Sequence, residues 1–358
     1  MNIVFVIDTM HSGGAAKKIS LIAGELAERG YKVTILTDMS QGCIYNLNSH
    51  IILRHFYNSE ISRNRFTKLW GKLKRIRGIV KDLSPDVVVS VLPHVSFCVK
   101  IALSGMRIPI VFSDETSFAR KDKKFVAFVR HCFYNVADAV VILTENDRKL
   151  LGWNIPQKVV IHNPVVCPLW KNDFSHKQKI IFGIGALCEW NVKGFDLLFK
   201  SFALLKDKYS DWSIWLAGDD SVPYRHIVYD KAVAEGIEDR VMFLGLRPDI
   251  YNVMAEATIY ALSSRVEGFS LSMVEAISQG CACVAFDNHG VVREVSCGGK
   301  GVEIVEDGNI DAYAYAIEKL IRDEEYRIQS VMNGKSIIDN YSIEMIVDKW
   351  EELFISLK

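Results

Sequence analysis

The amino-acid sequence predicts an α/β protein that contains two doubly wound parallel sheets. Its 358 residues are too many for one ordinary α/β core, so two domains are expected, and 49% hydrophobic residues suffice for a core in each. Strand-like apolar runs alternate with amphipathic helical stretches along the whole chain, which is typical of parallel sheets. A polar, proline-containing stretch near the middle separates two similar series of such elements.

The first series begins with a strand-like run at 2–8, a loop with two glycines and a helix near 15–29. Gly30 suits the left-handed residue that often follows a helix. Further strand-like runs continue the series, as a doubly wound sheet requires. They cover 31–38, 86–92, 109–115, 137–144 and 158–165.

A linker is indicated by Pro164, Pro168 and the polar stretch 171–179. We predict two Rossmann-like domains, 1–168 and 169–339, and a C-terminal helix at 340–358 that crosses back to the first domain. Ligands of open parallel sheets bind beyond the carboxyl ends of the strands, so the loops at these ends should line a cleft. The strand-like runs of the second series are 180–185, 212–219, 240–245, 257–264, 281–286 and 301–305.

The formal net charge of zero conceals an asymmetry between the two halves. Residues 1–165 carry 23 basic and 13 acidic side chains, and the rest of the chain is acidic by the same margin. This split predicts that the first half faces an anionic partner, although two domains that attract each other would show it equally well.

The eight cysteines are scattered, and no Cys-x-x-Cys pair occurs. Reduced thiols are therefore expected, more than a disulfide framework or a metal site. The opening segment is short and strand-like, and no apolar stretch approaches the ~20 residues that span a bilayer. We expect a cytoplasmic protein that is soluble or peripheral to the membrane.

The most specific motif is a pair of glutamates eight residues apart, Glu267 and Glu275. Glu267 follows a strand-like run, and a helix should start near Ser270, so that Glu275 lies in its second turn. Free backbone amides at a helix start bind phosphate, and the two carboxylates could hydrogen-bond hydroxyls of a sugar or ribose. A solvated glutamate pair is the alternative, which the intervening Gly268 and the preceding strand disfavour.

Two glycine-containing turns are weaker signals. One strand-like run ends at Gly185, and Lys193 stands before the next helix, where it could neutralise a leaving diphosphate or be an ordinary surface lysine. At the first strand–helix junction, Gly13 and Gly14 would let the backbone approach a ligand, although a tight turn needs them equally. No nicotinamide-type Gly-x-Gly-x-x-Gly follows.

Together these motifs resemble the retaining glycosyltransferases of family 4, which have the GT-B fold. The resemblance spans nearly the whole chain, and the Glu-x7-Glu block is its most specific part. It is closest to enzymes that add sugars to lipid-linked intermediates of bacterial surface polysaccharides and glycans. The matching segments are 13–14, 193–196, 217–219, 267–275 and 280–285.

The resemblance implies transfer of a hexose or N-acetylhexosamine from a nucleotide sugar, UDP-linked by family frequency, with no metal and no other cofactor. It also implies that domain 1–168 binds the acceptor and domain 169–339 binds the nucleotide sugar. Glu275 would hold the donor ribose, and Glu267 would lie near the transferred sugar and the diphosphate. The base would meet the loop at Leu246 and Arg247. The other expected donor contacts are Gly13, Gly14, Gly185, Lys193, Ser264, Gly268, Phe269, Ser270 and Leu271.

The chain departs from the family pattern at two places. Ala186 stands where the family commonly has an arginine, and Arg265, Arg247 or Arg293 could replace that cation. Glu115 takes the place of a histidine that often closes a strand of the first domain. His94, at the end of another strand, is a second catalytic candidate, or else an ordinary loop histidine.

The stretch 63–81 is basic and amphipathic, and a second basic cluster at 120–128 contains two phenylalanines. Such segments bind anionic membrane surfaces, which would place the protein on the inner face of the cytoplasmic membrane. A solvated helix packed on the sheet is the alternative, and no nucleic-acid recognition motif occurs. The residues expected at the membrane or acceptor are Lys68, Trp70, Lys72, Lys74, Arg75, Lys123 and Lys124.

Other functions stay open on the sequence alone. A nucleotide-sugar epimerase would change the free donor without any acceptor. A sugar phosphorylase would need a cofactor-lysine context and a longer chain. A non-catalytic partner subunit with the same fold would bind a donor without turnover, and Ala186 keeps that alternative open.

Overall fold

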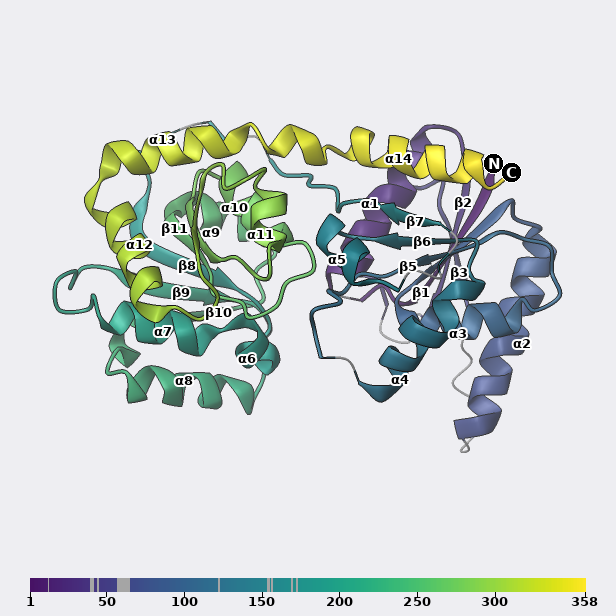
Figure 1. Ribbon diagram of the computed structural model, residues 1–358, viewed down its shortest axis with the longest axis horizontal. Helices are drawn as coiled ribbons and strands as arrows, with labels where there is room; N and C mark the ends of the chain where they lie inside the picture. Colours follow the sequence, from purple (N-terminus) through teal and green to yellow (C-terminus); the bar gives the residue numbers. More distant parts are fainter. Residues whose placement is uncertain are drawn as a thin grey trace. The chain divides into compact units, whose positions relative to one another are not determined.

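The computed structural model (Figure 1) describes the chain except residues 12, 39–41, 44, 57–64, 122, 153–154, 156, 169 and 172, and the side chains of 65 and 66. The chain forms two compact units. Unit 1 comprises Met1–Pro164 and Tyr341–Lys358, and unit 2 comprises Val165–Asn340. Each unit is built on one parallel sheet, which confirms the predicted fold class.

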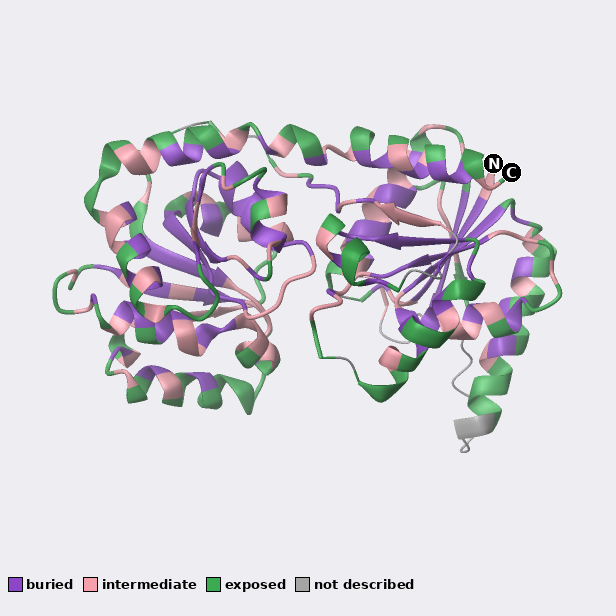
Figure 2. Ribbon diagram, viewed as in Figure 1, coloured by how far each residue is buried: buried purple, intermediate pink, exposed green. Residues whose placement is uncertain are grey.

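The sheet of unit 1 has seven strands in the order β3-β2-β1-β4-β5-β6-β7. Its side chains alternate between two hydrophobic layers: Ile3 and Phe5 of the first strand pack on one face, and Val4 packs on the other. The central strands are buried (Figure 2), as in parallel sheets that helices cover on both sides. The strands are β1 (Asn2–Thr9), β2 (Lys32–Asp38), β3 (Ile52–His55), β4 (Val87–Val91), β5 (Ile110–Ser113), β6 (Ala139–Ile142) and β7 (Lys158–Val160).

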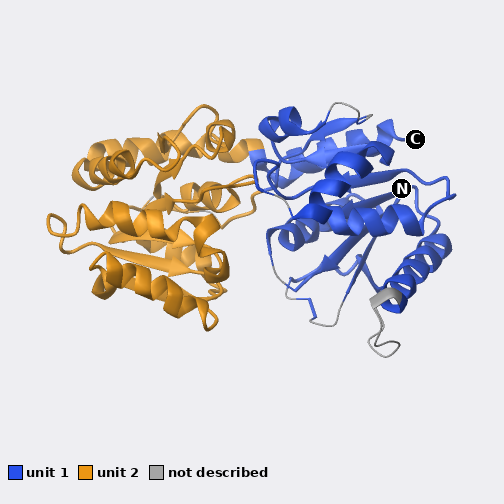
Figure 3. Cartoon of the chain, turned by 60° about the horizontal axis from the view of Figure 1, so that its bottom comes forward, with its two compact units in different colours: residues 1–164, 341–358 blue, residues 165–340 orange. Residues whose placement is uncertain are grey.

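One face of this sheet is covered by α1 (Gly14–Glu28) and α14 (Ile343–Ser356), and the other by α2 (Arg65–Leu83) and α3 (Pro93–Ala102). Trp350 of α14 is fully buried, with its ring edge-on to Phe5 at 6.4 Å between centroids. This buried indole explains why the C-terminal segment belongs to unit 1 (Figure 3). Shorter elements are α4 (Lys124–Phe128), η1 (Val129–Phe133), η2 (Tyr134–Val136) and α5 (Glu145–Leu150).

The sheet of unit 2 has six parallel strands in the order β10-β9-β8-β11-β12-β13. They are β8 (Gln178–Ile184), β9 (Ser213–Ala217), β10 (Val241–Gly245), β11 (Ala257–Leu262), β12 (Ala282–Phe286) and β13 (Val302–Val305).

The helices of unit 2 form two groups, and contacts between helices connect the members of each group. One group comprises α7 (Phe195–Ala203), α8 (Tyr224–Ala234) and α12 (Ile310–Arg322), and the other α9 (Ile250–Glu256), α10 (Leu271–Ser278) and α13 (Glu324–Lys335). The shorter elements are η3 (Leu187–Glu189), α6 (Trp190–Lys193), η4 (Glu238–Arg240), α11 (Val291–Val295) and η5 (Ile338–Tyr341).

One described strand was not predicted from the sequence. Strand β3 is four residues long, ends in Arg54-His55 and is only partly covered at the sheet edge. An edge strand of this kind needs no continuous apolar run, so it gives little hydrophobic signal.

Each sheet has one place where the strand order reverses. In unit 1 this switch point lies between β1 and β4, and in unit 2 it lies between β8 and β11. Chains leave the two neighbouring strands toward opposite faces there, which opens a crevice at the carboxyl ends, where open α/β sheets bind ligands. The residues after these four strands are therefore the first to consider as a site.

Candidate active site

Two side chains of opposite charge meet across the switch point of unit 2. Lys193 ends α6, which follows β8, and Glu267 lies in the loop after β11. The Lys193 Nζ lies 3.0 Å from Glu267 Oε1, and the Ser264 hydroxyl donates to the same oxygen at 2.6 Å. The two charged side chains are 24% and 11% exposed, so a ligand can still reach them. The structure thus brings three of the predicted donor residues together.

The backbone beside Lys193 depends on glycine. Gly194 has φ 65°, and a Cβ at this position would lie 1.9 Å from the carbonyl oxygen of Ser263. Ser263 in turn donates its hydroxyl to the Lys193 carbonyl at 2.9 Å, and the Arg265 amide donates to the Val192 carbonyl at 2.8 Å. These contacts tie the loop after β8 to the loop after β11, and so set Lys193 beside Glu267.

Gly185, at the end of β8, has a steric role in the same place. A Cβ there would lie 2.7 Å from Lys193 Cγ, so the lysine stem lies in the space that the missing side chain leaves. The backbone amide of Gly185 is bound to the Ala217 carbonyl at 2.9 Å. Gly185 therefore positions the lysine, and any ligand contact of its own would be made through the backbone.

Helix α10 begins at Leu271, and Ser270 is its N-cap residue in the left-handed conformation, φ 60° and ψ 43°. Its side chain makes no capping bond, and its Oγ is buried without a hydrogen-bond partner in the described part of the chain. A left-handed serine is strained, and such strain is concentrated at ligand sites. The helix start thus offers backbone amides and an unused hydroxyl to an anion.

Glu275 lies in the second turn of α10, as predicted, and is buried. Tyr251 of α9 donates its hydroxyl to Glu275 Oε1 at 3.0 Å. Burial and the neighbouring charge of Glu275 raise the pKa of Tyr251 well above its usual range, so the phenol remains a neutral donor. Tyr251 could not be singled out from the sequence, because its partner is 24 residues away on another helix.

Three arginines could replace the cation that the family commonly has at the place of Ala186, and all three have carboxylate partners. Arg265 binds Asp196 with two nitrogens, at 2.8 and 2.7 Å. Arg247 binds Asp249 in the same way, at 2.7 and 2.6 Å, and Arg293 lies 3.3 Å from Asp287. A ligand phosphate would therefore compete with an existing ion pair at each of them.

A hollow of about 230 Å³ lies next to Ser264 at the carboxyl ends of β11, β12 and β13. His289, which lines the hollow, and its neighbour Asn288 have φ near 57° and 50°, and both backbone amides donate to the carboxylate of Asp307. The hollow is lined by charged, polar and apolar groups, as sugar-sized sites commonly are. The lining residues are Leu197, Ser264, Arg265, Phe286, His289, Asp307 and Gly308.

Unit 1 has a second cluster of charged side chains, also at its switch point. Asp8, near the end of β1, accepts a hydrogen bond from Lys72 Nζ at 2.8 Å and lies 3.1 Å from His94 Nε2. The bond with His94 and the charge of Lys72 hold the pKa of Asp8 far below its usual range, although burial opposes them. His94 is 42% exposed and Asp8 is 44% exposed, so this cluster is open to ligands.

Glu115 occupies the predicted place after β5, but its side chain is only 5% exposed. Its Oε1 lies 3.0 Å from Lys18 Nζ and accepts a bond from the Ser113 hydroxyl at 2.6 Å. Lys18 is 1% exposed and also lies over the Trp350 ring at 5.7 Å. In this structure Glu115 joins β5 to α1, and of the two catalytic candidates in unit 1 only His94 is accessible.

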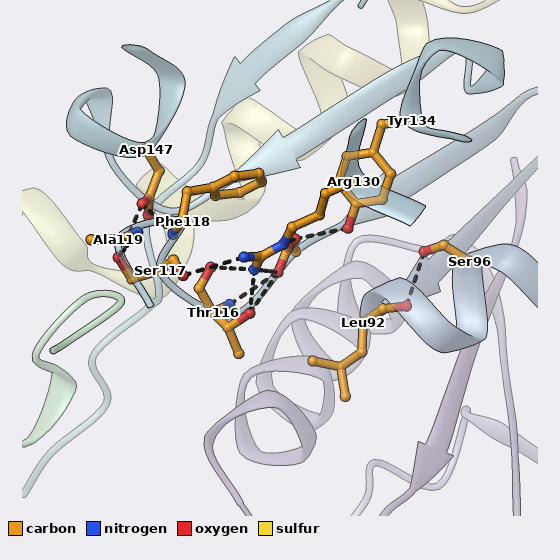
Figure 4. A network of polar contacts seen from close by, with 10 residues as sticks. Leu92, Ser96, Thr116, Ser117, Phe118, Ala119, Arg130, Tyr134 and Asp147 are labelled. Carbon is orange, nitrogen blue, oxygen red and sulfur yellow. Dashed lines mark hydrogen bonds and ion pairs between the residues drawn. The ribbon is translucent and has the colours of Figure 1, made fainter. Parts of the chain in front are cut away.

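A buried polar network holds the loop after β5, which carries Glu115 (Figure 4). Arg130 binds both oxygens of Asp114, at 2.8 and 2.9 Å, and its guanidinium stacks on the Phe118 ring at 4.0 Å. Asp147 accepts the Phe118 amide at 2.8 Å and the Ser117 hydroxyl at 3.2 Å. Arg130 lies in η1, a π-helical turn, and such turns often occur near functional sites.

Further contacts complete this network. Tyr134 donates its hydroxyl to Asp114, and burial together with the Asp114 charge raises the pKa of Tyr134 well above its usual value. Thr116 binds Asp114 with its amide and its hydroxyl, at 3.2 and 3.0 Å. The loop is therefore rigidly held, and the sequence did not reveal it because its partners lie on separate elements.

The glycine turn after β1 has the conformation that its sequence suggested. Gly13 is the N-cap residue of α1 with φ 103°, which side chains rarely adopt, and the Tyr45 hydroxyl donates to its carbonyl at 3.0 Å. A Cβ at Gly13 or Gly14 would meet nothing within 4 Å, so both face open space. Ser12 of this motif lies outside the described residues.

Most of the residues expected at a membrane are exposed on α2 and around α4, namely Lys68, Trp70, Lys74, Arg75, Lys123 and Lys124. Lys72 is the exception: its side chain is 15% exposed, and its Nζ lies on Asp8 and over the Phe56 ring at 4.5 Å. The expectation for Lys72 is therefore corrected, because its side chain turns toward Asp8 near the end of β1. Arg63 and the side chain of Phe66 lie outside the described residues.

Among the described residues, no helix is both long and apolar enough to cross a bilayer. No three histidine, cysteine, aspartate or glutamate side chains in the same residues gather as metal ligands would.

Each of the two units is a Rossmann-like domain. In unit 2, a helix start that could bind phosphate lies between Glu267 and Glu275. This combination is typical of the GT-B class of glycosyltransferases. Comparison with known families agrees with this class. Residues 12–167 match the family described as Glycosyltransferase Family 4, and residues 169–337 match Glycosyl transferases group 1. The chain belongs to the glycosyltransferases of the family 4 type.

Relatives that match nearly the whole chain are also named as glycosyltransferases. An uncharacterized glycosyltransferase of Haemophilus influenzae is 26% identical over 97% of this chain and 98% of its own. An α-1,4-N-acetyl-D-galactosaminyltransferase of Campylobacter jejuni, named for a diphospho-undecaprenol-linked acceptor, is 24% identical over 100% of this chain and 99% of its own.

Solved structures show the same fold. Sucrose-phosphate synthase of Thermosynechococcus elongatus superimposes with a TM-score of 0.84 at 15% identity, over 99% of this chain and 98% of that one. HepE of Anabaena in complex with UDP-glucose gives 0.82 at 19% identity, over 99% and 100%. At these identities the likeness establishes the GT-B fold alone.

Proposed function

We propose that this protein transfers a hexose or N-acetylhexosamine from a UDP-linked sugar to a lipid-linked saccharide during surface-glycan assembly. The transfer would retain the anomeric configuration and need no metal ion. The observation that carries the proposal is the meeting of Lys193, Glu267 and Ser264 at the switch point of unit 2, beside the start of α10.

The donor would be held along α10. Glu275, already oriented by Tyr251, would accept hydrogen bonds from the ribose hydroxyls. The diphosphate oxygens would accept hydrogen bonds from the backbone amides of residues 268–271 and from the Ser270 hydroxyl, which has no partner among the described residues. Glu267 would then bind hydroxyls of the transferred sugar. UDP is supported by the UDP and UDP-glucose complexes of HepE, which has the same fold.

Charge on the leaving diphosphate rises as the bond to the anomeric carbon breaks. Lys193 is placed to neutralise it, by exchanging part of its contact with Glu267 for a phosphate oxygen. This cation and the helix start would perform the role that a divalent ion has in other transferases. Retention rests on the family 4 resemblance, because no residue of the sequence shows the stereochemistry directly.

The lipid-linked acceptor is supported by the names of relatives. Several are transferases of Campylobacter jejuni and Escherichia coli named for acceptors on diphospho-undecaprenol. An acceptor of this kind would be used at a membrane surface. The exposed Lys68, Lys74 and Arg75 of α2, with Trp70 beside them, provide a surface that could attach reversibly to anionic lipid.

The central experiment uses purified protein, a panel of UDP-sugars, a polyprenyl-diphosphate-linked saccharide and excess chelator. We expect a new glycosidic linkage by mass spectrometry, with an NMR coupling constant that shows the donor configuration. Inversion would contradict the retaining mechanism, and loss of activity that only magnesium or manganese restores would contradict metal independence. Isomerisation of the donor alone would favour an epimerase, and binding without turnover a partner subunit.

Membrane attachment is tested separately by sedimentation with vesicles. Wild-type protein should sediment with vesicles that contain anionic lipid and stay in solution with neutral ones, because each basic residue near the surface contributes about 1 kcal/mol. Changing Lys68, Lys74 and Arg75 to glutamate should abolish sedimentation. The matched control places the same charge change on the exposed Lys200, Lys300 and Arg322 of unit 2. Equal sedimentation of both triple variants would rule out this surface.

A further inference from the structure

The switch point of unit 1 carries a histidine–carboxylate pair that the donor site does not use. Asp8 comes from β1, and His94 comes from the start of α3, directly after β4. These are the two strands between which the order of the sheet reverses. The pair therefore lies where an open α/β sheet presents its ligand crevice, and both side chains are more than two-fifths exposed.

The hydrogen bonds of Asp8 determine which nitrogen of His94 carries the proton. Lys72 donates to Oδ1 of Asp8, and His94 Nε2 lies on Oδ2. A carboxylate that is held ionised by these partners can only accept, so Nε2 carries a proton, and Nδ1 is the acceptor whenever the ring has only one proton. The lone pair of Nδ1 then remains, and no hydrogen bond from the described residues reaches it.

A lone pair of this kind suits a neutral hydroxyl. An anion would be repelled by the Asp8 carboxylate next to it, whereas a hydroxyl can donate to Nδ1 without placing a charge there. Glu115, another carboxylate at the carboxyl ends of these strands, is covered by Lys18 and offers no such acceptor. Nδ1 of His94 is thus an accessible hydrogen-bond acceptor at this switch point.

We propose that His94 Nδ1 binds the attacking hydroxyl of the saccharide acceptor, with Asp8 and Lys72 as positioning residues that set the tautomer. The inference rests on the proposed transfer reaction and names the acceptor contact within it. Lys72 contributes indirectly, since it keeps Asp8 ionised and fixed in orientation.

The test uses two variants of nearly unchanged size, Asp8→Asn and His94→Gln. In Asp8→Asn the amide oxygen should keep the Lys72 bond, which turns the NH₂ group toward His94 Nε2. That nitrogen must then accept, so the proton moves to Nδ1 and the hydroxyl loses its acceptor. His94→Gln keeps a donor near Asp8 but has no atom in the place of Nδ1.

We expect both variants to lower kcat/KM for the acceptor about tenfold, the effect of one lost hydrogen bond. UDP affinity by calorimetry should match that of wild type, and both variants should remain folded. Nitrogen-15 NMR of labelled histidine should show that the His94 proton moves from Nε2 to Nδ1 in Asp8→Asn. A role that is only structural would change stability without this selective loss for the acceptor.

Normal transfer by Asp8→Asn after a verified tautomer change would overturn the inference while leaving the transferase proposal intact. Normal transfer by His94→Gln would have the same meaning. Absence of transfer by wild-type protein across the acceptor panel, despite UDP binding, would instead refute the proposed function, and the acceptor site with it.

Discussion

The switch points of the two units carry charged pairs that differ in arrangement and accessibility. In unit 2 a cation, Lys193, follows the first strand, and a carboxylate, Glu267, follows the strand across the switch point. In unit 1 the carboxylate comes first: Asp8 lies in β1, and His94 follows β4 across the switch point. The same sheet topology therefore presents a cation beside a helix start in one unit and an imidazole paired with a carboxylate in the other.

This difference indicates what each edge can bind. A lysine next to backbone amides suits a diphosphate, whose charge increases during the reaction. An imidazole held by a carboxylate suits an uncharged hydroxyl. A third pair, Lys18 with Glu115, is almost completely covered, so its role is to stabilise the fold. Exposure thus separates the pairs that a ligand can reach from the pair that joins elements.

The largest effect is expected at the covered pair. Lys18→Met should lower the free energy of unfolding by about 3–5 kcal/mol, because it leaves the Glu115 carboxylate buried without its counter-charge. Chemical denaturation measures this loss. Adding Glu115→Leu should recover part of it, and Arg148→Ala, which breaks the exposed pair with Glu145, should change little. Similar values for Lys18→Met and Arg148→Ala would remove the distinction by exposure.

The next effect is on turnover at the switch point of unit 2. Lys193→Gln should lower kcat about 10²–10³-fold, because a preorganised group that stabilises developing charge is lost. Steady-state transfer assays measure it. The control is Lys179→Gln, which removes an exposed lysine paired with Asp211 in the same unit. A normal kcat for Lys193→Gln would show that the leaving group is neutralised elsewhere.

Donor affinity should be affected separately from turnover. Glu275→Ala should weaken UDP binding by about 1.5–3 kcal/mol, the value of hydrogen bonds to a charged group. Glu267→Ala should reduce mainly turnover, since it is expected to contact the transferred sugar and not the nucleoside. Calorimetry with UDP distinguishes the two. Equal UDP affinity in Glu275→Ala and wild type would contradict the role of Glu275.

The smallest effect concerns pH and Asp8. Its pKa is lower in the folded state than in the unfolded chain, so its contribution to stability is present above about pH 4 and is lost as the pH falls further. Because the side chain is 44% exposed, that contribution should stay below about 1 kcal/mol. The difference in unfolding free energy between wild type and Asp8→Asn should therefore shrink from pH 6 to pH 3. A constant difference would mean that the Asp8 charge is not stabilising.

Much of this molecule could be predicted from local sequence. The apolar runs with glycine turns identify twelve of the thirteen described strands, and the short polar edge strand β3 is the one that they miss. The Glu-x7-Glu spacing places Glu267 before a helix and Glu275 in its second turn, because both positions depend only on helix periodicity. Gly13 and Gly194 are likewise local, since each has a positive φ.

What the sequence by itself determined was therefore the fold class, the helix start at Leu271 and the placement of Glu267 and Glu275 around it. Which distant side chains meet was decided only by the tertiary structure. His94 and Asp8 are separated by 86 positions, Lys18 and Glu115 by 97, and the helical pattern of α2 could not show that Lys72 turns away from Lys68 and Lys74 toward Asp8. The physical reason is that strand order, which no local pattern encodes, places the ends of β1, β4 and β5 side by side and so determines which charges become partners.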